Sequence, residues 1–253
     1  MKQNQKQQID EIQNKIEGSV LKGRYAIGRL IDRGSFGRVF KCIDLQDKNR
    51  PLVVKIASDY KQFGNEINSM RKIYKKKSNN FSKYSTPEVV EYGMILFKNQ
   101  TTIKEELLSY MIMPRYGQNL EHFFEKQKCK ISHNTILEIA LGTLDMLESV
   151  HAAGYAYNDL KLDNIMVGFQ NKLAKEYKAE NVLADASLHL VDFGFATRFI
   201  NKSTGLHIEE DEVETFRGNM IFGSLNQLNF MTTTRRDDLI SLCYMTIYML
   251  NNG

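Results

Sequence analysis

The sequence contains few cysteines and no long apolar run. Cys42, Cys129 and Cys243 lie far apart and lack the spacing of metal ligands. Because their number is odd, a disulfide framework is disfavoured and a reducing compartment is expected. The longest apolar-rich stretch, residues 239–250, is too short to span a membrane and is interrupted by polar residues. We therefore expect no membrane insertion.

The sequence also lacks a strong excess of charge of one sign. Its 34 basic and 30 acidic residues are spread along the chain and give a net charge of +4. This pattern lacks the one-sided basic patch of a dedicated nucleic-acid binder, so no nucleic-acid partner is expected. Five glutamines precede residue 14 without an apolar core, which fits neither a secretory signal nor a transit peptide. An intracellular, cytoplasmic location is expected, with the nucleus or cytoskeleton left open.

The first part of the chain carries the pattern of a β-rich unit. Short β-branched and aromatic runs are separated by turn residues, which predicts antiparallel strands around one helix. The expected strands are residues 25–31, 39–43, 52–57, 89–97 and 107–113. The expected helix covers residues 61–77, with Ile67, Met70, Ile73 and Tyr74 on one apolar stripe. Residues 5–17 could form a further short helix or a frayed polar extension.

The pattern becomes helical after Gly117. Apolar residues recur with a period of 3.6, which predicts a long amphipathic helix. Its stripe comprises Ile136, Ile139, Ala140, Thr143, Leu144, Leu147 and Val150. Residues 171–185 form a polar segment typical of a surface insertion, and residues 235–250 predict a final apolar helix. With 253 residues, the chain can form one large domain or two packed lobes of an α+β protein.

A pair of glycines marks a turn between two predicted strands, in the segment 34–39 with the sequence GSFGRV. Its place between two strands disfavours a Rossmann or Walker phosphate site, which needs a strand followed by a helix. Glycines at the tip of a β-hairpin can bring backbone N–H groups close to phosphates. Such glycines also occur in hairpins for purely conformational reasons, so this motif alone leaves both interpretations open.

Lys55 interrupts an apolar run that predicts a buried strand. A desolvated lysine is costly unless anions pair with it, so Lys55 should bind a carboxylate and a phosphate. Glu66, eleven residues further on in the predicted helix, is the candidate carboxylate. A solvent-exposed Glu66 fits the sequence equally well.

The strongest motif is YNDLKLDN at residues 157–164, which is followed by Asp192-Phe193-Gly194. With Asp159, Asn164 and Asp192 at matching positions, the sequence resembles the catalytic loop and magnesium-binding triplet of eukaryotic protein kinases. This resemblance implies a two-lobed fold, with a small β-rich N-lobe and a mostly α C-lobe. It also implies transfer of the γ-phosphoryl group of ATP to Ser or Thr hydroxyls of protein substrates.

The resemblance assigns roles to the residues of this motif. Asp159 would orient the substrate hydroxyl and accept its proton, and Lys161 would steady the γ-phosphate. Asn164 and Asp192 would hold Mg²⁺. Because the reference pKa of aspartate, about 3.9, is low for a base at neutral pH, orientation is expected to matter more than basicity.

The resemblance also implies a nucleotide site and a domain plan. Residues 113–117 resemble the hinge between kinase lobes, where the Pro114 carbonyl and the Tyr116 N–H would bind adenine and Met113 would be the gatekeeper. The nucleotide site would comprise Gly34, Ser35, Gly37, Val39, Lys55, Glu66, Met113, Pro114 and Tyr116. The implied parts are a polar extension (1–22), an N-lobe (23–113), a hinge (114–117) and a C-lobe (118–253).

Two later segments resemble the casein kinase I superfamily, which includes the vaccinia-related kinases. Ser-Leu-Asn at 224–226 stands where most protein kinases have Ala-Pro-Glu, and Arg-Arg-Asp-Asp-Leu follows at 235–239. By this resemblance, Asp238 would brace the catalytic-loop backbone. The C-lobe would lack its last helices, and a partner would cover the apolar face thereby left exposed.

Three positions depart from the family pattern. Asp32 replaces the first glycine of the phosphate loop and would repel phosphates unless it faces solvent. Tyr157 replaces a histidine, and either ring can pack against Phe193. Asn158 replaces the arginine that pairs with a loop phosphate in kinases switched by phosphorylation.

The activation segment, residues 192–226, is therefore expected to be ordered without a phosphate. Its acidic residues, at 209–212 and 214, would repel one. Packing of Phe216, Phe222 and Leu225 is expected to hold the segment instead. The departures leave two alternatives to an active kinase: a kinase-fold pseudoenzyme that acts as a scaffold or binding module, and a small-molecule kinase of related fold.

Overall fold

The structure is a computed structural model of the chain that describes residues 16–34, 37–48, 50–76, 84–98, 105–168 and 187–253. The chain divides into two compact units. The first comprises Met1–Ile67 and Glu88–Arg115, and the second comprises Asn68–Pro87 and Tyr116–Gly253. The expected two-lobed α+β class is confirmed. Residues 5–15 of the possible N-terminal helix and the whole predicted insertion, 171–185, lie outside the described residues.

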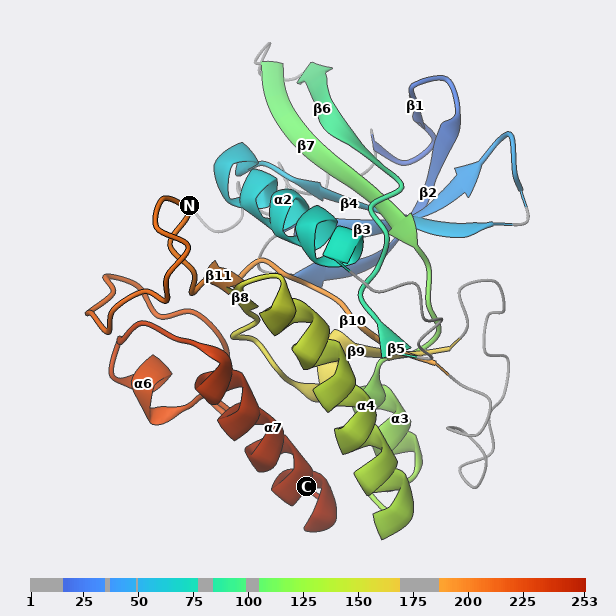
Figure 1. Ribbon diagram of the computed structural model, residues 1–253. Helices are drawn as coiled ribbons and strands as arrows, with labels where there is room; N and C mark the ends of the chain where they lie inside the picture. Colours follow the sequence, from blue (N-terminus) through green and yellow to red (C-terminus); the bar gives the residue numbers. More distant parts are fainter. Residues whose placement is uncertain (1–15, 35–36, 49, 77–83, 99–104, 169–186) are drawn as a thin grey trace, which may run out of the picture. The chain divides into compact units, whose positions relative to one another are not determined.

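The first unit is built on a six-stranded antiparallel sheet (Figure 1). The strand order is β1-β2-β3-β4-β7-β6, so β7 returns to pair with β4. The strands are β1 (Val20–Leu21), β2 (Tyr25–Gly34), β3 (Gly37–Asp44), β4 (Pro51–Ala57), β6 (Glu91–Lys98) and β7 (Glu105–Pro114). All five strands expected from the sequence are present, although their ends differ by a few residues.

One face of this sheet carries the core of the first unit. Alternate residues of the strands point to the same face, so Phe40 and Cys42 of β3 and Val54 and Ile56 of β4 are buried together. Ile16 joins this core, and β1 pairs with β2. The sheet thus begins before residue 23, within the segment expected to be a polar extension.

Helix α2 (Tyr60–Lys76) follows the sheet where a helix was expected. It begins after Asp59, whose side chain accepts hydrogen bonds from the N–H groups of Lys61 and Gln62. Its buried stripe comprises Phe63, Ile67, Met70 and Ile73. The assignment of Tyr74 to this stripe is wrong: the residue lies in the last turn, at the edge of the stripe, and is exposed.

The second unit is mostly helical, with short strands. Its helices are α3 (Leu120–Lys126), α4 (His133–Ala152), η1 (Leu162–Asn164), α6 (Leu225–Leu228) and α7 (Arg235–Leu250). Its strands are β5 (Tyr84–Ser85), β8 (Tyr155–Ala156), β9 (Ile165–Val167), β10 (Leu188–Leu190) and β11 (Thr197–Arg198). Helices α4 and α7 pack side by side, and the strands form two small sheets, β5-β10-β9 and β11-β8 (Figure 1).

Helix α4 is the predicted long amphipathic helix. Ser132 caps its N-terminus by accepting a hydrogen bond from the Thr135 N–H. The predicted stripe is buried at Ile136, Ile139, Thr143, Leu147 and Val150. Leu144 was wrongly placed on it, because together with Leu137 and Leu141 it forms a second apolar stripe that is exposed. None of the helices formed by the described residues is long and apolar enough to cross a membrane.

A partly buried ion pair gives a test of the first unit. Arg24 donates two hydrogen bonds to the buried carboxylate of Asp44, at 2.8 and 2.6 Å, and this contact lowers the pKa of Asp44 to about 2. Since the carboxylate of an unfolded chain titrates near 3.9, the pair contributes stability above that pH. This contribution is lost as the pH falls through about 2.

Asp44→Asn is therefore expected to lower the urea midpoint of unfolding at pH 7, and the difference from the parent should shrink as the pH falls from 4 toward 2. Arg50→Gln is the control, because Arg50 pairs with Glu88 on the surface. Its effect should stay below about 1 kcal/mol. Equal effects of the two substitutions at pH 7 would show that the Asp44 pair has no special weight.

Candidate functional site

Lys55 of β4 and Glu66 of α2 form a buried ion pair in the first unit. The lysine Nζ lies 2.7 Å from one carboxylate oxygen of Glu66 and 3.0 Å from the other. The side chains are 7% and 1% exposed. A buried charge needs such a partner, which explains how a lysine is tolerated in this apolar strand. The structure thus places Glu66 inside rather than in solvent, and the roles of both residues toward a nucleotide stay predictions.

The glycine hairpin joins β2 and β3. Gly34 pairs with Gly37, while Ser35 and Phe36 between them lie outside the described residues. Gly37 has a φ of 146°, and a Cβ at this position would lie 2.5 Å from the Ile56 carbonyl oxygen. Only glycine fits there, and the close approach keeps the hairpin against β4. Val39 is half-buried and is the strand partner of Lys55.

Asp32, the departure at the phosphate loop, is exposed. Its carboxylate accepts a hydrogen bond of 2.7 Å from the N–H of the adjacent Arg33. Burial therefore does not force the Asp32 carboxylate to face the phosphates that it would repel.

The hinge residues end the last strand of the sheet and begin the second unit. Met113 and Pro114 pair with Val53 and Leu52 of β4, and Met113 is buried. In the second unit, Tyr116 is buried and its ring stacks on the His189 ring, with centroids 3.8 Å apart. Their proposed contacts with adenine remain predictions.

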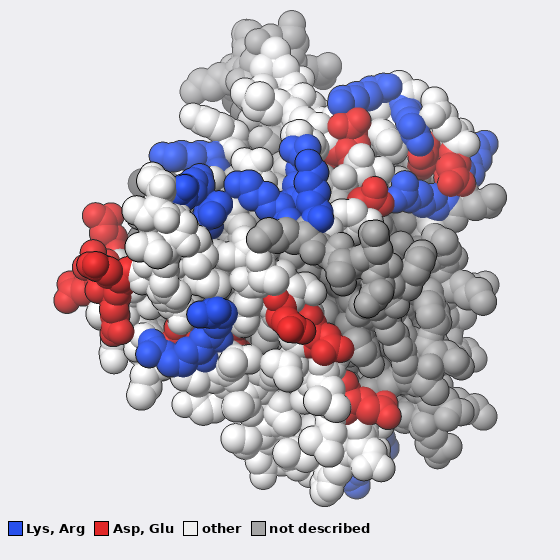
Figure 2. All heavy atoms as spheres, viewed as in Figure 1, with Lys and Arg blue, Asp and Glu red and all other residues white. Residues whose placement is uncertain are grey.

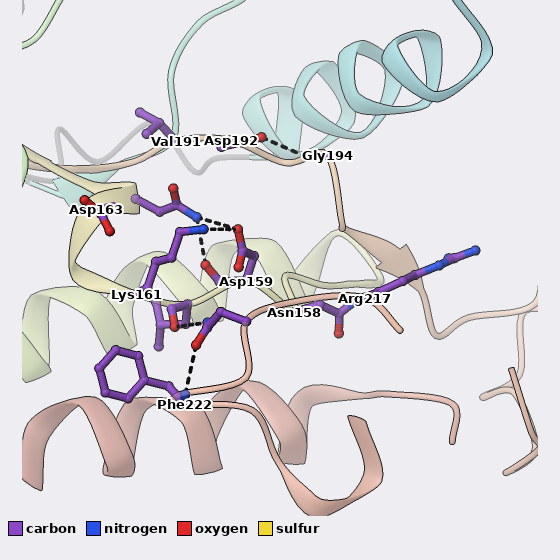
Figure 3. Close-up of polar contacts among 12 residues, drawn as sticks. Asn158, Asp159, Lys161, Asp163, Val191, Asp192, Gly194, Arg217 and Phe222 are labelled. Atoms are coloured by element: carbon purple, nitrogen blue, oxygen red, sulfur yellow. Dashed lines mark hydrogen bonds and ion pairs between the residues drawn. The ribbon is translucent and has the colours of Figure 1, made fainter. Parts of the chain in front are cut away.

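The catalytic-loop residues of the second unit gather around the Asp159 carboxylate (Figure 3). Its Oδ2 accepts hydrogen bonds from Lys161 Nζ and Asn164 Nδ2, both at 2.9 Å. Asn164 also donates to the Asp159 carbonyl at 2.8 Å. The other oxygen, Oδ1, is buried and has no hydrogen-bond partner among the described residues. One oxygen is therefore fixed by the loop, and the other remains to accept a proton or a hydrogen bond.

The environment of Asp159 changes its acidity. Burial raises the pKa of this carboxyl above its ordinary value, and the nearby Asp192 carboxylate adds to the increase. The hydrogen bond and positive charge of Lys161, and the hydrogen bond from Asn164, lower this pKa in part. The expectation based on the reference pKa therefore underestimates the basicity of Asp159, because desolvation depends on the folded structure.

Asp192 is brought beside this cluster by the backbone. The Val191 N–H donates to the Asn164 carbonyl at 2.9 Å, and the Tyr157 hydroxyl donates to the Val191 carbonyl. Asp192 has a φ of 60°, in the left-handed region, and its Oδ1 accepts from the Gly194 N–H at 3.3 Å.

The tyrosine that replaces the usual histidine packs as expected. The rings of Tyr157 and Phe193 meet edge to face, with centroids 5.1 Å apart. Tyr157 therefore contributes both ring packing and a hydrogen bond to the segment that carries Asp192.

Asp238 braces the catalytic loop from α7, which confirms the expectation. Its carboxylate accepts hydrogen bonds from the N–H groups of Tyr157 and Asn158, both at 2.8 Å. His151 Nε2 lies 2.7 Å from the same carboxylate. Asn158 has a φ of 72°, so its N–H is turned to Asp238 by a left-handed backbone that asparagine tolerates better than most residues.

The activation segment is held to this loop by hydrogen bonds. The Asn158 amide donates to the Phe195 carbonyl and to the Thr197 hydroxyl, both at 2.8 Å. The Gln227 amide donates to the carbonyls of Asn158 and Arg217, at 2.8 and 2.9 Å. These contacts join the two ends of the segment to the residue that precedes Asp159.

The expected aromatic and leucine anchors are only partly present. Phe222 is buried, and Phe216 is half-buried with its ring 6.3 Å from that of Phe230. Leu225 is 69% exposed, so its assignment as an anchor is wrong. The reason is the capping box of α6, which turns Ser224 inward to donate to Asp237 and leaves Leu225 on the outside of the first turn.

The comparisons with known proteins agree with this geometry. The protein kinase domain matches residues 25–252. The chain belongs to the protein kinase domain family. The structure therefore shows how a kinase-family sequence with Tyr157 and Asn158 arranges its catalytic loop.

Relatives support the expected resemblance to casein kinase I. Casein kinase I homolog 3 of Schizosaccharomyces pombe is 28% identical over 90% of this chain and 46% of its own length. Nucleosomal histone kinase 1 of Drosophila melanogaster is 28% identical over 92% of this chain and 37% of its own length. Casein kinase I homolog RAG8 of Kluyveromyces lactis is 26% identical over 89% of this chain and 38% of its own length. The chain thus spans less than half the length of these kinases.

Some residues that position this kinase site were missed in the sequence. His151, Asn219 and Gln227 make side-chain contacts to Asp238 or to the catalytic-loop backbone. Gln227 contacts a carbonyl 69 residues away, which no local pattern indicates. The only available signal for Gln227 was its position three residues after Ser224, which predicts a capping box but not the contact with Asn158.

The hydrogen bonds of Asn158 predict an activation segment that is ordered without phosphate. Phosphatase-treated protein from bacteria should resist trypsin within residues 198–217. Thr215→Ala, which removes a hydroxyl next to the acidic residues as a site for a phosphate, should behave like the parent. Asn158→Gly keeps the positive φ but removes the amide, so cleavage should accelerate by about tenfold. Asn229→Gly, at an exposed residue, is the control. Rapid cleavage of the dephosphorylated parent, reversed by rephosphorylation, would contradict this prediction.

Proposed function

We propose that this chain catalyses the transfer of the γ-phosphoryl group of ATP to Ser or Thr hydroxyls of proteins. The observation that carries the proposal is the Asp159 carboxylate. One oxygen is held by Lys161 and Asn164, while the other is buried without a hydrogen-bond partner among the described residues. Such a group is preorganised to receive a hydroxyl.

The residues present fit the ATP and Mg²⁺ that protein kinases use in general. Asn164 and Asp192 offer the amide and carboxylate oxygens that suit Mg²⁺. Bound Mg·ATP would supply the phosphoryl group and neutralise its charge.

The chain's own residues would divide the remaining work. Asp159 orients the acceptor hydroxyl and takes its proton, for which the pKa raised by burial makes it a better base. Lys161, whose Nζ lies 2.9 Å from Asp159 Oδ2, keeps a positive charge beside the acceptor site. Lys55, aligned by Glu66, binds phosphates. Gly34, Gly37 and Val39 would cover the nucleotide, with Ser35 expected at the hairpin tip.

The alternative of a kinase-fold scaffold loses one of its supports. It was motivated by Asp32, but this residue is exposed and its carboxylate already accepts a hydrogen bond from Arg33. Protein substrates are expected from the family, and the name of the Drosophila relative suggests nucleosomal histones as one class to try.

The expected location and the expected partner stay predictions. A partner on the C-lobe is supported by exposed apolar residues on two helices of the second unit. They are Leu137, Leu141 and Leu144 on α4, and Tyr244, Ile247 and Leu250 on α7. A cytoplasmic location rests on the sequence alone.

The decisive assay compares two aspartates of the same loop. Asp159→Asn keeps the size of the side chain but removes the base, so transfer of radiolabel from ATP to casein or to a basic protein should fall by at least about 100-fold. Asp163→Asn is the matched control, because Asp163 is exposed and its carboxylate accepts a hydrogen bond from Asn119, outside the Asp159 cluster. Equal activity of parent and Asp159→Asn would refute the proposed mechanism.

Lys55→Met tests the phosphate-binding role. The methionine keeps an apolar stem but removes the charge, so kcat/KM for ATP should fall by about 100-fold or more. Because Glu66 would lose the ammonium group that offsets the burial of its carboxylate, the double variant Lys55→Met with Glu66→Gln serves to maintain the fold and should be equally inactive. Lys61→Met, at an exposed position of α2, should keep full activity. Unchanged turnover in folded Lys55→Met protein would contradict this role.

A further inference from the structure

The activation segment exposes large apolar side chains immediately after its contact with the catalytic loop. Met220 and Ile221 are 77% and 76% exposed, and Leu225 follows in the same short turn and helix. We call these three residues the apolar platform. Neighbouring apolar residues that remain exposed in an ordered segment are typical of binding surfaces.

The position of this platform is fixed by hydrogen bonds. Asn219 donates from Nδ2 to the Leu160 carbonyl at 2.9 Å and accepts from the Phe222 N–H at 2.8 Å. A Cβ at Gly218 would lie 2.5 Å from the Asn158 carbonyl oxygen, so the backbones touch there. Figure 3 shows the two segments lying against each other. Because Leu160 lies between Asp159 and Lys161, the chain that leads into Met220 and Ile221 is held against the catalytic loop.

A run of acidic residues lies on the same segment. Its members, all exposed, are Glu209, Glu210, Asp211, Glu212 and Glu214. They form no ion pair with another described residue. Backbone hydrogen bonds from Val213 to Phe230 and from Thr232 to Asp211, at 2.7 and 2.8 Å, tie this acidic run to the chain that follows the platform. Figure 2 shows the acidic side chains gathered at the left edge of the surface.

We propose that the activation segment selects protein acceptors that carry an apolar side chain close to the phosphorylated hydroxyl and basic residues further along. The platform would bury the apolar side chain, and the acidic run would pair with the basic ones. This inference rests on the proposed kinase function. Charge complementarity favours these basic acceptors over acidic or phosphorylated peptides, which the acidic run would repel.

The experiment uses the complete chain and a peptide with one serine in a background of alanine and glycine. Leucine and arginine are scanned through every position on both sides of the serine. One position should be improved on the order of tenfold by leucine, the gain expected from partial burial of one apolar side chain. Each favourable arginine should lower KM roughly 2- to 5-fold, as exposed ion pairs do, and glutamate should raise KM there.

Variants assign each preference to its surface. Ile221→Gln, alone and with Met220→Gln, should remove the leucine preference while turnover of a peptide without leucine changes little. Glu209→Lys with Glu210→Lys should remove the arginine preference and its dependence on salt. The matched controls lie on α4: Leu141→Gln for the exposed apolar residues, and Glu138→Lys with Glu148→Lys for the charges. Both controls should keep both preferences.

Failure of this inference can be told apart from failure of the proposed function. Phosphorylation of the library without either preference, or preferences retained in the variants, would overturn the inference and leave the kinase function standing. Binding of fluorescent peptides is measured in parallel. Selective binding that the variants lose, without turnover, would support the surface and overturn the kinase function. Neither binding nor turnover would overturn both.

Discussion

The geometry of the catalytic loop depends on one buried carboxylate, that of Asp238. It is 1% exposed and accepts hydrogen bonds from two successive backbone N–H groups, those of Tyr157 and Asn158. The N–H of Asn158 can reach it only because the backbone there is left-handed. A buried carboxylate without these donors would be costly, so the loop conformation and the carboxylate stabilise each other. The first turn of α7 also favours negative charge at its N-terminus.

The adjacent Asp237 uses the same helical turn for the other half of the site. It accepts hydrogen bonds from the Ser224 hydroxyl and the Thr234 N–H, and thereby fixes the end of the activation segment. Two consecutive aspartates therefore tie two separate segments to one helix. The contrast with Lys55 and Glu66 is informative, since that pair buries two opposite charges that bind each other directly. Buried charge organises both parts of the candidate site, through backbone donors in the second unit and through a side-chain pair in the first.

Sequence reasoning succeeded where the cause is local. Helix α7 was predicted with the bounds 235–250 that the structure shows, because its apolar residues are contiguous in the sequence. Reasoning failed where a side chain's direction depends on distant contacts. Leu225 was expected to be buried. Ser224 is buried instead, because its hydroxyl donates a hydrogen bond to the buried carboxylate of Asp237. The acidity of Asp159 was also misjudged, since desolvation cannot be read from neighbours in the sequence. The catalytic motifs were found because the chemistry requires particular residue types at fixed spacing.

Asn158 connects the order of the activation segment with its charge. An arginine at this position would need an anion to offset its desolvation, whereas the NH₂ group of the neutral Asn158 amide is satisfied by a carbonyl and a hydroxyl of the segment itself. A segment held in this way does not require a phosphate to stay in place. It can therefore carry several carboxylates without losing an ordering contact, which a phosphate-dependent segment could not do, because the carboxylates would repel the phosphate. The amide at Asn158 and the exposed acidic run are therefore compatible with each other, because the contacts of Asn158 that hold the segment involve no negative charge.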